Sequence, residues 1–172
     1  RAATPPEDLP ADVVDIGFDR LLKQLRLGVE TAGNDSLLAR ETYSLVLNTH
    51  LRQELEQGDA RARIDAVYER YSLWSWAGLH FARDRGIPSV LEVNAPLVQE
   101  QQSYRDLSLR PVATAIEGLL LREADAVIVP SGELRPHVRA AAGKRRKVHV
   151  IPNGADLDLF ALVLHTERFL GL

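Results

Sequence analysis

Cysteine and methionine are both absent from the 172 residues. Without cysteine the chain has no disulfide, no thiolate zinc ligand and no cysteine nucleophile, and this composition fits a reducing compartment. The first residue is arginine, and the opening RAATPPEDLP has the composition of a loop. We therefore expect the chain to begin inside a longer protein.

Long apolar runs and a strong net charge are also missing. Stretches such as Ala124–Pro130 fall far short of the roughly 20 apolar residues of a membrane-spanning helix, and no signal peptide is recognisable. We therefore expect a cytoplasmic protein. The net charge is −3, so no global field attracts nucleic acid, and we expect no nucleic-acid partner. The sequence leaves open a peripheral membrane contact and a homo-oligomer.

Several sequence motifs of enzymes do not occur. The chain contains no G-x-x-x-x-G-K-S/T phosphate loop, no G-x-G-x-x-G after a strand, no G-x-S-x-G and no H-E-x-x-H. Its five histidines lack the spacing of metal ligands. A self-contained nucleotide enzyme or hydrolase of these types is disfavoured.

What the chain does contain is an alternation of apolar segments and segments with helical period. The predicted strands are Ile64–Tyr68, Ser89–Val93, Ala126–Val129 and Val148–Ile151, with a weaker one at Asp12–Ile16. The predicted helices are Leu37–Leu55, Leu73–Arg85, Val112–Arg122 and Leu134–Ala142. This alternation predicts an α/β fold with a mostly parallel sheet and right-handed crossovers.

Capping residues and prolines set the expected ends of these helices. Ser72 is expected to cap the helix that follows it, and Gly86 to end that helix in a left-handed conformation. Pro111 suits the first turn of the next helix, while Pro136 either begins the last helix or kinks it. Glu117 lies beside the predicted apolar stripe, which consists of Val112, Ile116, Leu119 and Leu120.

Polar residues follow every predicted strand. Parallel α/β sheets bind ligands beyond the carboxyl ends of their strands, so these residues are the candidates for substrate binding. They are Glu69, Arg70, Glu92, Asn94, Ser131, Asn153 and Gly154. Glu92 is the most informative, because a carboxylate within a buried strand costs several kcal/mol unless it is paired or near water.

Structural interpretations of the same residues stay open. Glu92 could form an ion pair with Arg70 alone, and Ser131 could serve only as a helix cap. Trp74 and Trp76 are candidates for stacking on a sugar, but helical spacing favours core packing for Trp76 and places Trp74 nearer to solvent.

Three segments together resemble a known family: VYERYSLWSWAGLHFARDRGIPSVLEVNAPLVQEQ, EADAVIVPS and KVHVIPNGADLDLF. They are similar to the N-terminal, acceptor-side domain of retaining glycosyltransferases of family 4, which have the GT-B fold. The likeness runs over Ile64–Phe160 and more faintly over Pro5–Leu55. It implies a Rossmann-like three-layer domain over residues 1–160, an incomplete half of a GT-B fold, followed by a linker or tail at 161–172.

The resemblance also implies a function. In these enzymes the N-terminal domain holds the acceptor and the C-terminal domain grips the nucleotide sugar. The chain is then the acceptor-binding half of a bacterial enzyme of carbohydrate biosynthesis, which transfers a sugar from a nucleotide-sugar donor to a glycan or glycoconjugate acceptor. It is expected to be inactive without the C-terminal domain and to need no metal and no cofactor, with the nucleotide sugar as a substrate.

Site residues follow from the same resemblance. The acceptor side is expected to contain Glu69, Arg70, Glu92 and Asn94, and the donor-phosphate side Ser131, Asn153 and Gly154. Asn94 departs from the family, because many members have a histidine there and an amide is no general base near neutral pH. In retaining enzymes of this fold the departing phosphate is thought to take the acceptor's proton. The alternatives are a non-catalytic α/β binding module and half of a sugar-nucleotide epimerase.

Overall fold

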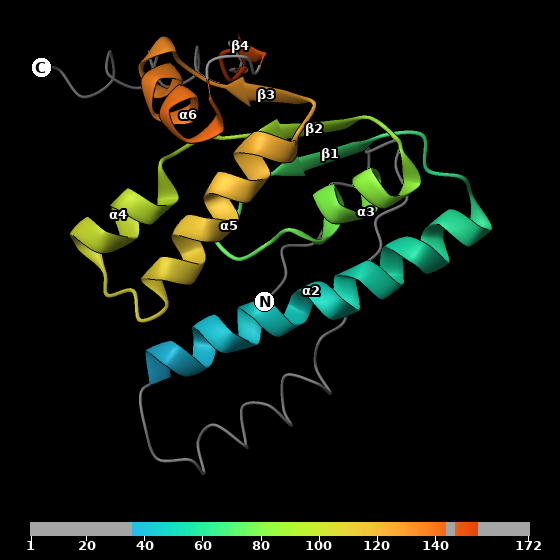
Figure 1. Cartoon of the computed structure of the whole chain (residues 1–172), viewed down its shortest axis with the longest axis horizontal. Helices are drawn as coiled ribbons and strands as arrows, with labels where there is room; N and C mark the ends of the chain where they lie inside the picture. The colour runs from blue at the N-terminus through green and yellow to red at the C-terminus, as the bar shows by residue number, and fades with distance from the viewer. Residues whose placement is uncertain (1–35, 144–146, 155–172) are drawn as a thin grey trace, which may run out of the picture.

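The computed structural model describes residues 36–143 and 147–154 (Figure 1). The predicted strand Asp12–Ile16 and the predicted tail at 161–172 lie outside these residues. The helices are α2 (Ser36–Arg61), α3 (Ala77–Arg85), α4 (Leu97–Tyr104), α5 (Arg110–Glu123) and α6 (Arg135–Ala142), with a 3₁₀ turn η1 (Gly132–Leu134). The strands are β1 (Val67–Arg70), β2 (Ser89–Glu92), β3 (Ala126–Val129) and β4 (Val148–Val150).

The four strands form one parallel sheet in the order β1-β2-β3-β4. Neighbours in the sheet are thus also neighbours along the chain, and right-handed crossovers then bring all the connecting helices to the same face. In Figure 1, α3 and α5 lie between the strands β1 and β2 and the long helix α2, which packs against α3. The domain is α/β and Rossmann-like, with its parallel sheet flanked by helices, as the sequence predicts.

Alternation along the strands separates two faces of the sheet. Leu91, Val93, Val127 and Val129 are fully buried and pack against α3, α5 and α6 in the main core. Residues on the other face of the four strands are exposed or half-buried: Tyr68, Arg70, Val90, Glu92, Ile128 and His149. The core therefore sits between one sheet face and the crossover helices.

The helix α3 begins four residues later than predicted, at Ala77, and Ser72 does not cap it. The first free amides of the helix are bound from another element instead. The Oδ1 atom of Asn48 in α2 accepts hydrogen bonds from the backbone N–H groups of Trp76 at 2.8 Å and Ala77 at 3.0 Å. A cap from a helix far away in the sequence replaces the local one.

Glycine and proline act where the sequence predicts them. Gly86 follows α3 with a φ of 64°, a left-handed conformation that costs glycine little, and its N–H donates to the carbonyls of Ala82 and Arg83. Pro111 lies in the first turn of α5. Pro136 lies in the first turn of α6, so the helix begins there rather than kinking.

The buried stripe of α5 differs from the predicted one. Ile116 and Leu120 are buried as expected, but Val112 is 38% exposed and Leu119 is 40% exposed. Glu117, which was placed beside the stripe, is only 6% exposed. The helix is rotated relative to the predicted orientation, because Glu117 faces hydrogen-bonding partners inside the domain. The short helix α4 was not predicted at all.

Candidate functional site

The carboxyl ends of all four strands lie at one edge of the sheet, because the strands are parallel. The predicted first strand is shifted, however. Glu69 and Arg70 are the last two residues of β1 rather than the residues that follow it. Successive strand residues point to opposite faces, so these two side chains are separated by the sheet.

Glu92 ends β2 on the face opposite the main core, and two side chains hold its carboxylate. The hydroxyl of Tyr68 donates to Oε2 at 2.5 Å, and the Nδ2 group of Asn94 donates to Oε1 at 2.6 Å. These hydrogen bonds lower the pKa of Glu92 below its usual value, the bond from Tyr68 having the largest effect. The carboxylate is therefore ionised at neutral pH and keeps lone pairs for further donors.

Arg70 acts on Glu92 only at longer range. Within the described part of the chain no direct ion pair joins them, although the positive charge of Arg70 also lowers the pKa of Glu92. The register pairs the two residues on neighbouring strands, so both side chains belong to the same face. A simple Arg70–Glu92 ion pair is thus not what holds this carboxylate.

Asn94 brings an unusual atom to this cluster. Its Oδ1 atom is buried and has no hydrogen-bond partner among the described residues. An unsatisfied buried acceptor costs about 1–3 kcal/mol, so native proteins seldom leave one without a reason. The Glu92–Asn94 pair therefore combines an ionised carboxylate with an unused acceptor at the end of β2.

Glu69 lies on the other face and stabilises the fold there. Its Oε1 accepts a hydrogen bond from the hydroxyl of Ser75 at 2.6 Å, and its Oε2 accepts one from the backbone N–H of Leu79 at 3.0 Å. The contact is close, since a Cβ added at Gly78 would lie 2.6 Å from Oε2. The structure thus places Glu69 at the first turn of α3, away from Glu92.

Ser131, Asn153 and Gly154 follow β3 and β4 at the same edge. Ser131 is half-buried with extended backbone, and in the described part of the chain its side chain makes no capping hydrogen bond to η1. Asn153 and Gly154 are exposed. The structure thus brings these three residues to neighbouring strand ends.

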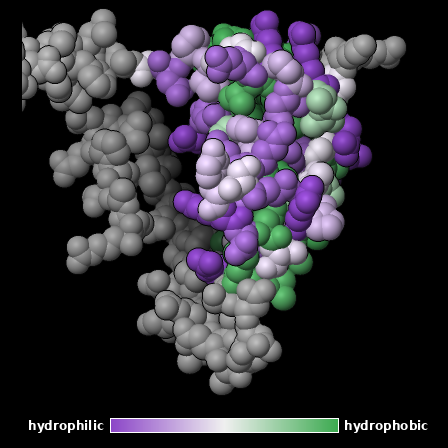
Figure 2. All heavy atoms as spheres, turned by 90° about the vertical axis from the view of Figure 1, so that its left-hand side faces the viewer, coloured by the Kyte–Doolittle hydropathy of each residue, from purple (hydrophilic) through white to green (hydrophobic). Residues whose placement is uncertain are grey.

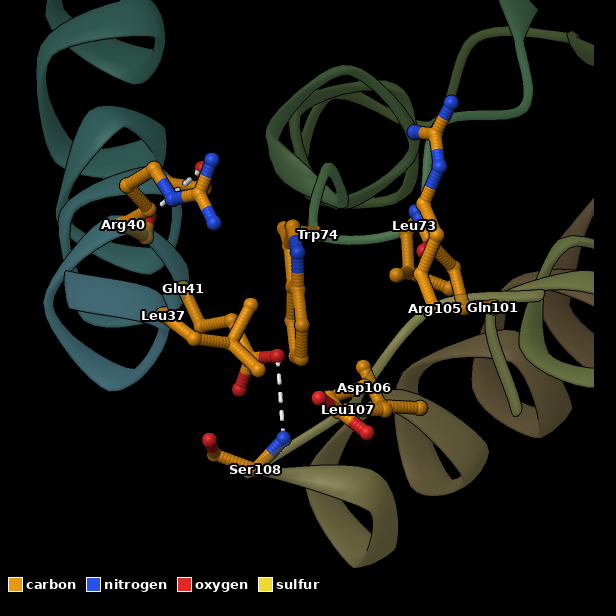
Figure 3. A pocket seen from close by; sticks show the side chains of 11 residues that line it. Leu37, Arg40, Glu41, Leu73, Trp74, Gln101, Arg105, Asp106, Leu107 and Ser108 are labelled. Atoms are coloured by element: carbon orange, nitrogen blue, oxygen red, sulfur yellow. Dashed lines mark hydrogen bonds between the residues drawn. The ribbon is translucent and has the colours of Figure 1, made fainter. Parts of the chain in front are cut away.

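A cleft of about 700 Å³ opens between α2, the connection from β1 to α3, and the end of α4 with the loop that follows it. Its walls include Arg40, Trp74, Gln101, Arg105 and Asp106, and Figure 3 shows the indole of Trp74 standing between α2 and the α4–α5 loop. None of the seven predicted site residues lines it. Only Trp74 was signalled by the sequence, because the other four have no distinguishing spacing.

The matches to known proteins decide which family the chain belongs to. A family model for glycosyltransferase family 4 matches residues 16–159. The chain belongs to glycosyltransferase family 4. Neither a search of curated proteins nor a search of solved structures found a match.

Inside this glycosyltransferase family 4 domain lies a buried polar cluster that the sequence analysis missed. The hydroxyl of Tyr71 donates to Oε1 of Glu117 at 3.2 Å, and Nε2 of His137 lies 3.2 Å from the same oxygen. Burial, followed by the negative charge of Glu117, raises the pKa of Tyr71, which keeps its hydroxyl protonated. The cluster ties the end of β1 to α5 and α6.

The side of the family 4 domain on which α4 lies is mostly hydrophilic, with smaller apolar patches between the polar side chains (Figure 2). Among the described residues no helix is both long and apolar enough to cross a membrane. The same residues contain no group of three or more histidine or acidic side chains arranged to hold a metal ion.

Proposed function

We propose that this domain is the acceptor-binding half of a retaining glycosyltransferase with the GT-B fold. The enzyme transfers a sugar from a nucleotide-sugar donor to a glycan or glycoconjugate acceptor in the cytoplasm of a bacterium. A second Rossmann-like domain holds the donor, so the chain by itself transfers no sugar. Membership of glycosyltransferase family 4 supports the general activity.

The Glu92–Asn94 pair supports the acceptor role most directly. The carboxylate of Glu92 is ionised and half-buried, and the Oδ1 atom of Asn94 is a buried acceptor without a partner among the described residues. A sugar hydroxyl is a donor that the carboxylate of Glu92 can accept. Hydrogen bonds to charged groups contribute about 1.5–3 kcal/mol, enough to orient an acceptor hydroxyl.

The remaining residues fit a mechanism based on positioning. Asn94 orients a hydroxyl without removing its proton, and the departing phosphate of the donor takes that proton. Ser131 and Asn153 lie at neighbouring strand ends, on the side proposed for the donor phosphates. No protein general base is needed in this scheme, and neither is a metal or a cofactor.

Sugar transfer by the protein at its natural length tests the proposal. Each form of the protein, which is the wild type, Glu92→Gln or Glu100→Gln, is incubated with a panel of radiolabelled nucleotide sugars as donors. Lipids and glycans are supplied as acceptors. Losing a hydrogen bond to a charged group is expected to lower kcat/KM for the acceptor by about 10-fold or more in Glu92→Gln. Glu100, exposed on α4, is the matched control and should leave kcat/KM unchanged.

Two results contradict the proposal. One is a natural-length protein that transfers no sugar from any donor in the panel. The other is an equal effect of the Glu92 and Glu100 substitutions, which would remove Glu92 from the acceptor side.

A further inference from the structure

The cleft beside Trp74 lies outside the strand-end cluster of Glu92 and Asn94, and nothing in the proposed function uses it. Its volume of about 700 Å³ falls within the range of small-molecule sites, which is roughly 300–1,000 Å³. Its walls come from α2, the β1–α3 connection and the segment that joins α4 to α5. The cleft is therefore a formed concavity with no assigned ligand.

The walls of this cleft are held by hydrogen bonds on two sides. The backbone carbonyl of Trp74 accepts a hydrogen bond from Nδ2 of Asn48 at 2.8 Å. Across the cleft, the buried carboxylate of Glu41 accepts backbone N–H groups of Ser108 at 3.0 Å and Leu109 at 2.7 Å (Figure 3). A ligand that enters such a site orders little of the protein, which lowers the entropic cost of binding.

Charge decides which class of ligand suits the cleft. Arg40 and Arg105 line it together with the carboxylates of Glu41 and Asp106, so its two positive charges are matched by two negative ones. No net field favours an anion such as a phosphate. The exposed or half-buried polar groups of Gln101, Arg105 and Asp106 supply both donors and acceptors.

We propose that this cleft binds a neutral saccharide, with a sugar ring stacked on the indole of Trp74. A sugar combines an apolar C–H face with hydroxyl groups that both donate and accept, and the cleft pairs an aromatic face with planar polar side chains. Trp74 is half-buried, packs in part against the hydrophobic core and also lines a smaller apolar pocket that includes Leu47 and Leu51. Gln101 and Asp106 bind hydroxyls on the polar side.

This inference goes beyond the proposed function, because it places a saccharide away from the strand ends where transfer is proposed. Saccharide binding alone, without any measurement of sugar transfer, tests this inference. In an enzyme that acts on a glycan, the cleft holds a sugar unit at some distance from the reacting hydroxyl, and it contributes to acceptor affinity rather than to chemistry.

The two tryptophans of the chain provide the measurement. Indole N–H resonances are recorded by NMR for the 172-residue chain and assigned with Trp74→Phe and Trp76→Phe. The probes are the methyl glycosides of glucose, galactose, mannose and N-acetylglucosamine, together with maltose and cellobiose. At least one probe should shift the Trp74 resonance in a saturable way and leave the Trp76 resonance in place.

Adjacent glutamines of α4 give a matched pair of variants. Gln101 lines the cleft, whereas Gln102 is exposed outside it. Losing one hydrogen bond should weaken binding by about 3- to 10-fold in Gln101→Ala, and Gln102→Ala should bind like the wild type. Both positions lie at the surface of a short helix, so neither change threatens the fold.

Two outcomes overturn the inference. In one, the Trp74 resonance does not move with any probe at about 50 mM, a concentration that detects Kd values well above 1 mM. In the other, the Gln101 and Gln102 variants lose affinity equally. Saccharide binding at Trp74, together with a natural-length protein that transfers no sugar, would retain this inference and reject the proposed function. Sugar transfer by the natural-length protein without any shift of the Trp74 resonance would reject this inference and retain the proposed function.

Discussion

Replacing Asn48 with alanine should destabilise the domain more than most single substitutions, because this side chain joins α2 to the start of α3. Asn48 is 5% exposed. Its Oδ1 accepts the backbone N–H groups of Trp76 and Ala77, and its Nδ2 donates to the carbonyl of Trp74. It also donates to the carbonyl of Leu45 within its own helix, at 3.1 Å.

The magnitude follows from the groups that Asn48→Ala leaves without partners. Two N–H groups and one carbonyl between α2 and α3 lose their hydrogen bonds, and each orphaned buried group costs about 1–3 kcal/mol. Water will reach some of them, so we expect a loss of about 3–5 kcal/mol in the free energy of unfolding. Domains of this size are stable by only about 5–15 kcal/mol in total.

Urea denaturation followed by circular dichroism measures this loss. Thr49→Ala, at the exposed neighbouring position of α2, is the control and should change stability by no more than about 0.5 kcal/mol. The dependence of unfolding free energy on urea should keep its slope, since the same surface is exposed. A loss below about 1 kcal/mol in Asn48→Ala would refute the idea that these bonds hold the two helices together.

Five further substitutions, at four positions, test other parts of the structure. Glu117→Ala removes the acceptor of a buried Tyr hydroxyl and should cost about 2 kcal/mol in urea unfolding, while Glu117→Gln keeps an acceptor oxygen and should cost clearly less. Gly86→Ala forces alanine into a φ of 64° and should lower stability by about 1 kcal/mol. Gly58→Ala in α2 should instead raise stability by up to about 1 kcal/mol, since nothing lies within 4 Å of the added Cβ. If both glycine substitutions changed stability in the same direction, the left-handed conformation of Gly86 or the helical one of Gly58 would be wrong. Tyr68→Phe should return the lowered pKa of Glu92 toward its usual 4.5, as measured by NMR titration of the carboxyl carbon. A carboxyl group whose pKa is lower in the folded state stabilises the domain above its unfolded pKa, and this stability is lost as the pH falls through the folded pKa. Tyr68→Phe should therefore lower the free energy of unfolding at neutral pH and make it depend less steeply on pH below 4.5. An unchanged pKa of Glu92 in Tyr68→Phe would exclude the hydrogen bond.

The α/β architecture was predictable because it depends on signals that act over a few residues. Short apolar segments alternate with helical ones, and Gly86, Pro111 and Pro136 mark helix ends through their own backbone preferences. The family could also be predicted from the sequence, since the segments around β2, β3 and β4 resemble glycosyltransferase family 4 and a model of that family matches residues 16–159.

The site was predictable only in part. The polar character of Glu92 within a strand correctly marked a side chain that requires partners, yet Tyr68 was not among the partners considered. Glu69 looked equivalent to Arg70 because both follow an apolar run. A shift of two residues in the end of β1 placed them on opposite faces of the sheet.

By itself, the sequence determined the order of the four described strands and of the helices α2, α3, α5 and α6, the helix ends at glycine and proline, and the family, because each depends on local backbone preference or on motif spacing. Only the tertiary structure decided how α5 is rotated, which face each strand residue takes and what surrounds Trp74. Those features depend on partners distant along the chain. Asn48 caps a helix 28 residues later, and Tyr71 binds Glu117 across 46 residues, and no local pattern encodes such a pairing.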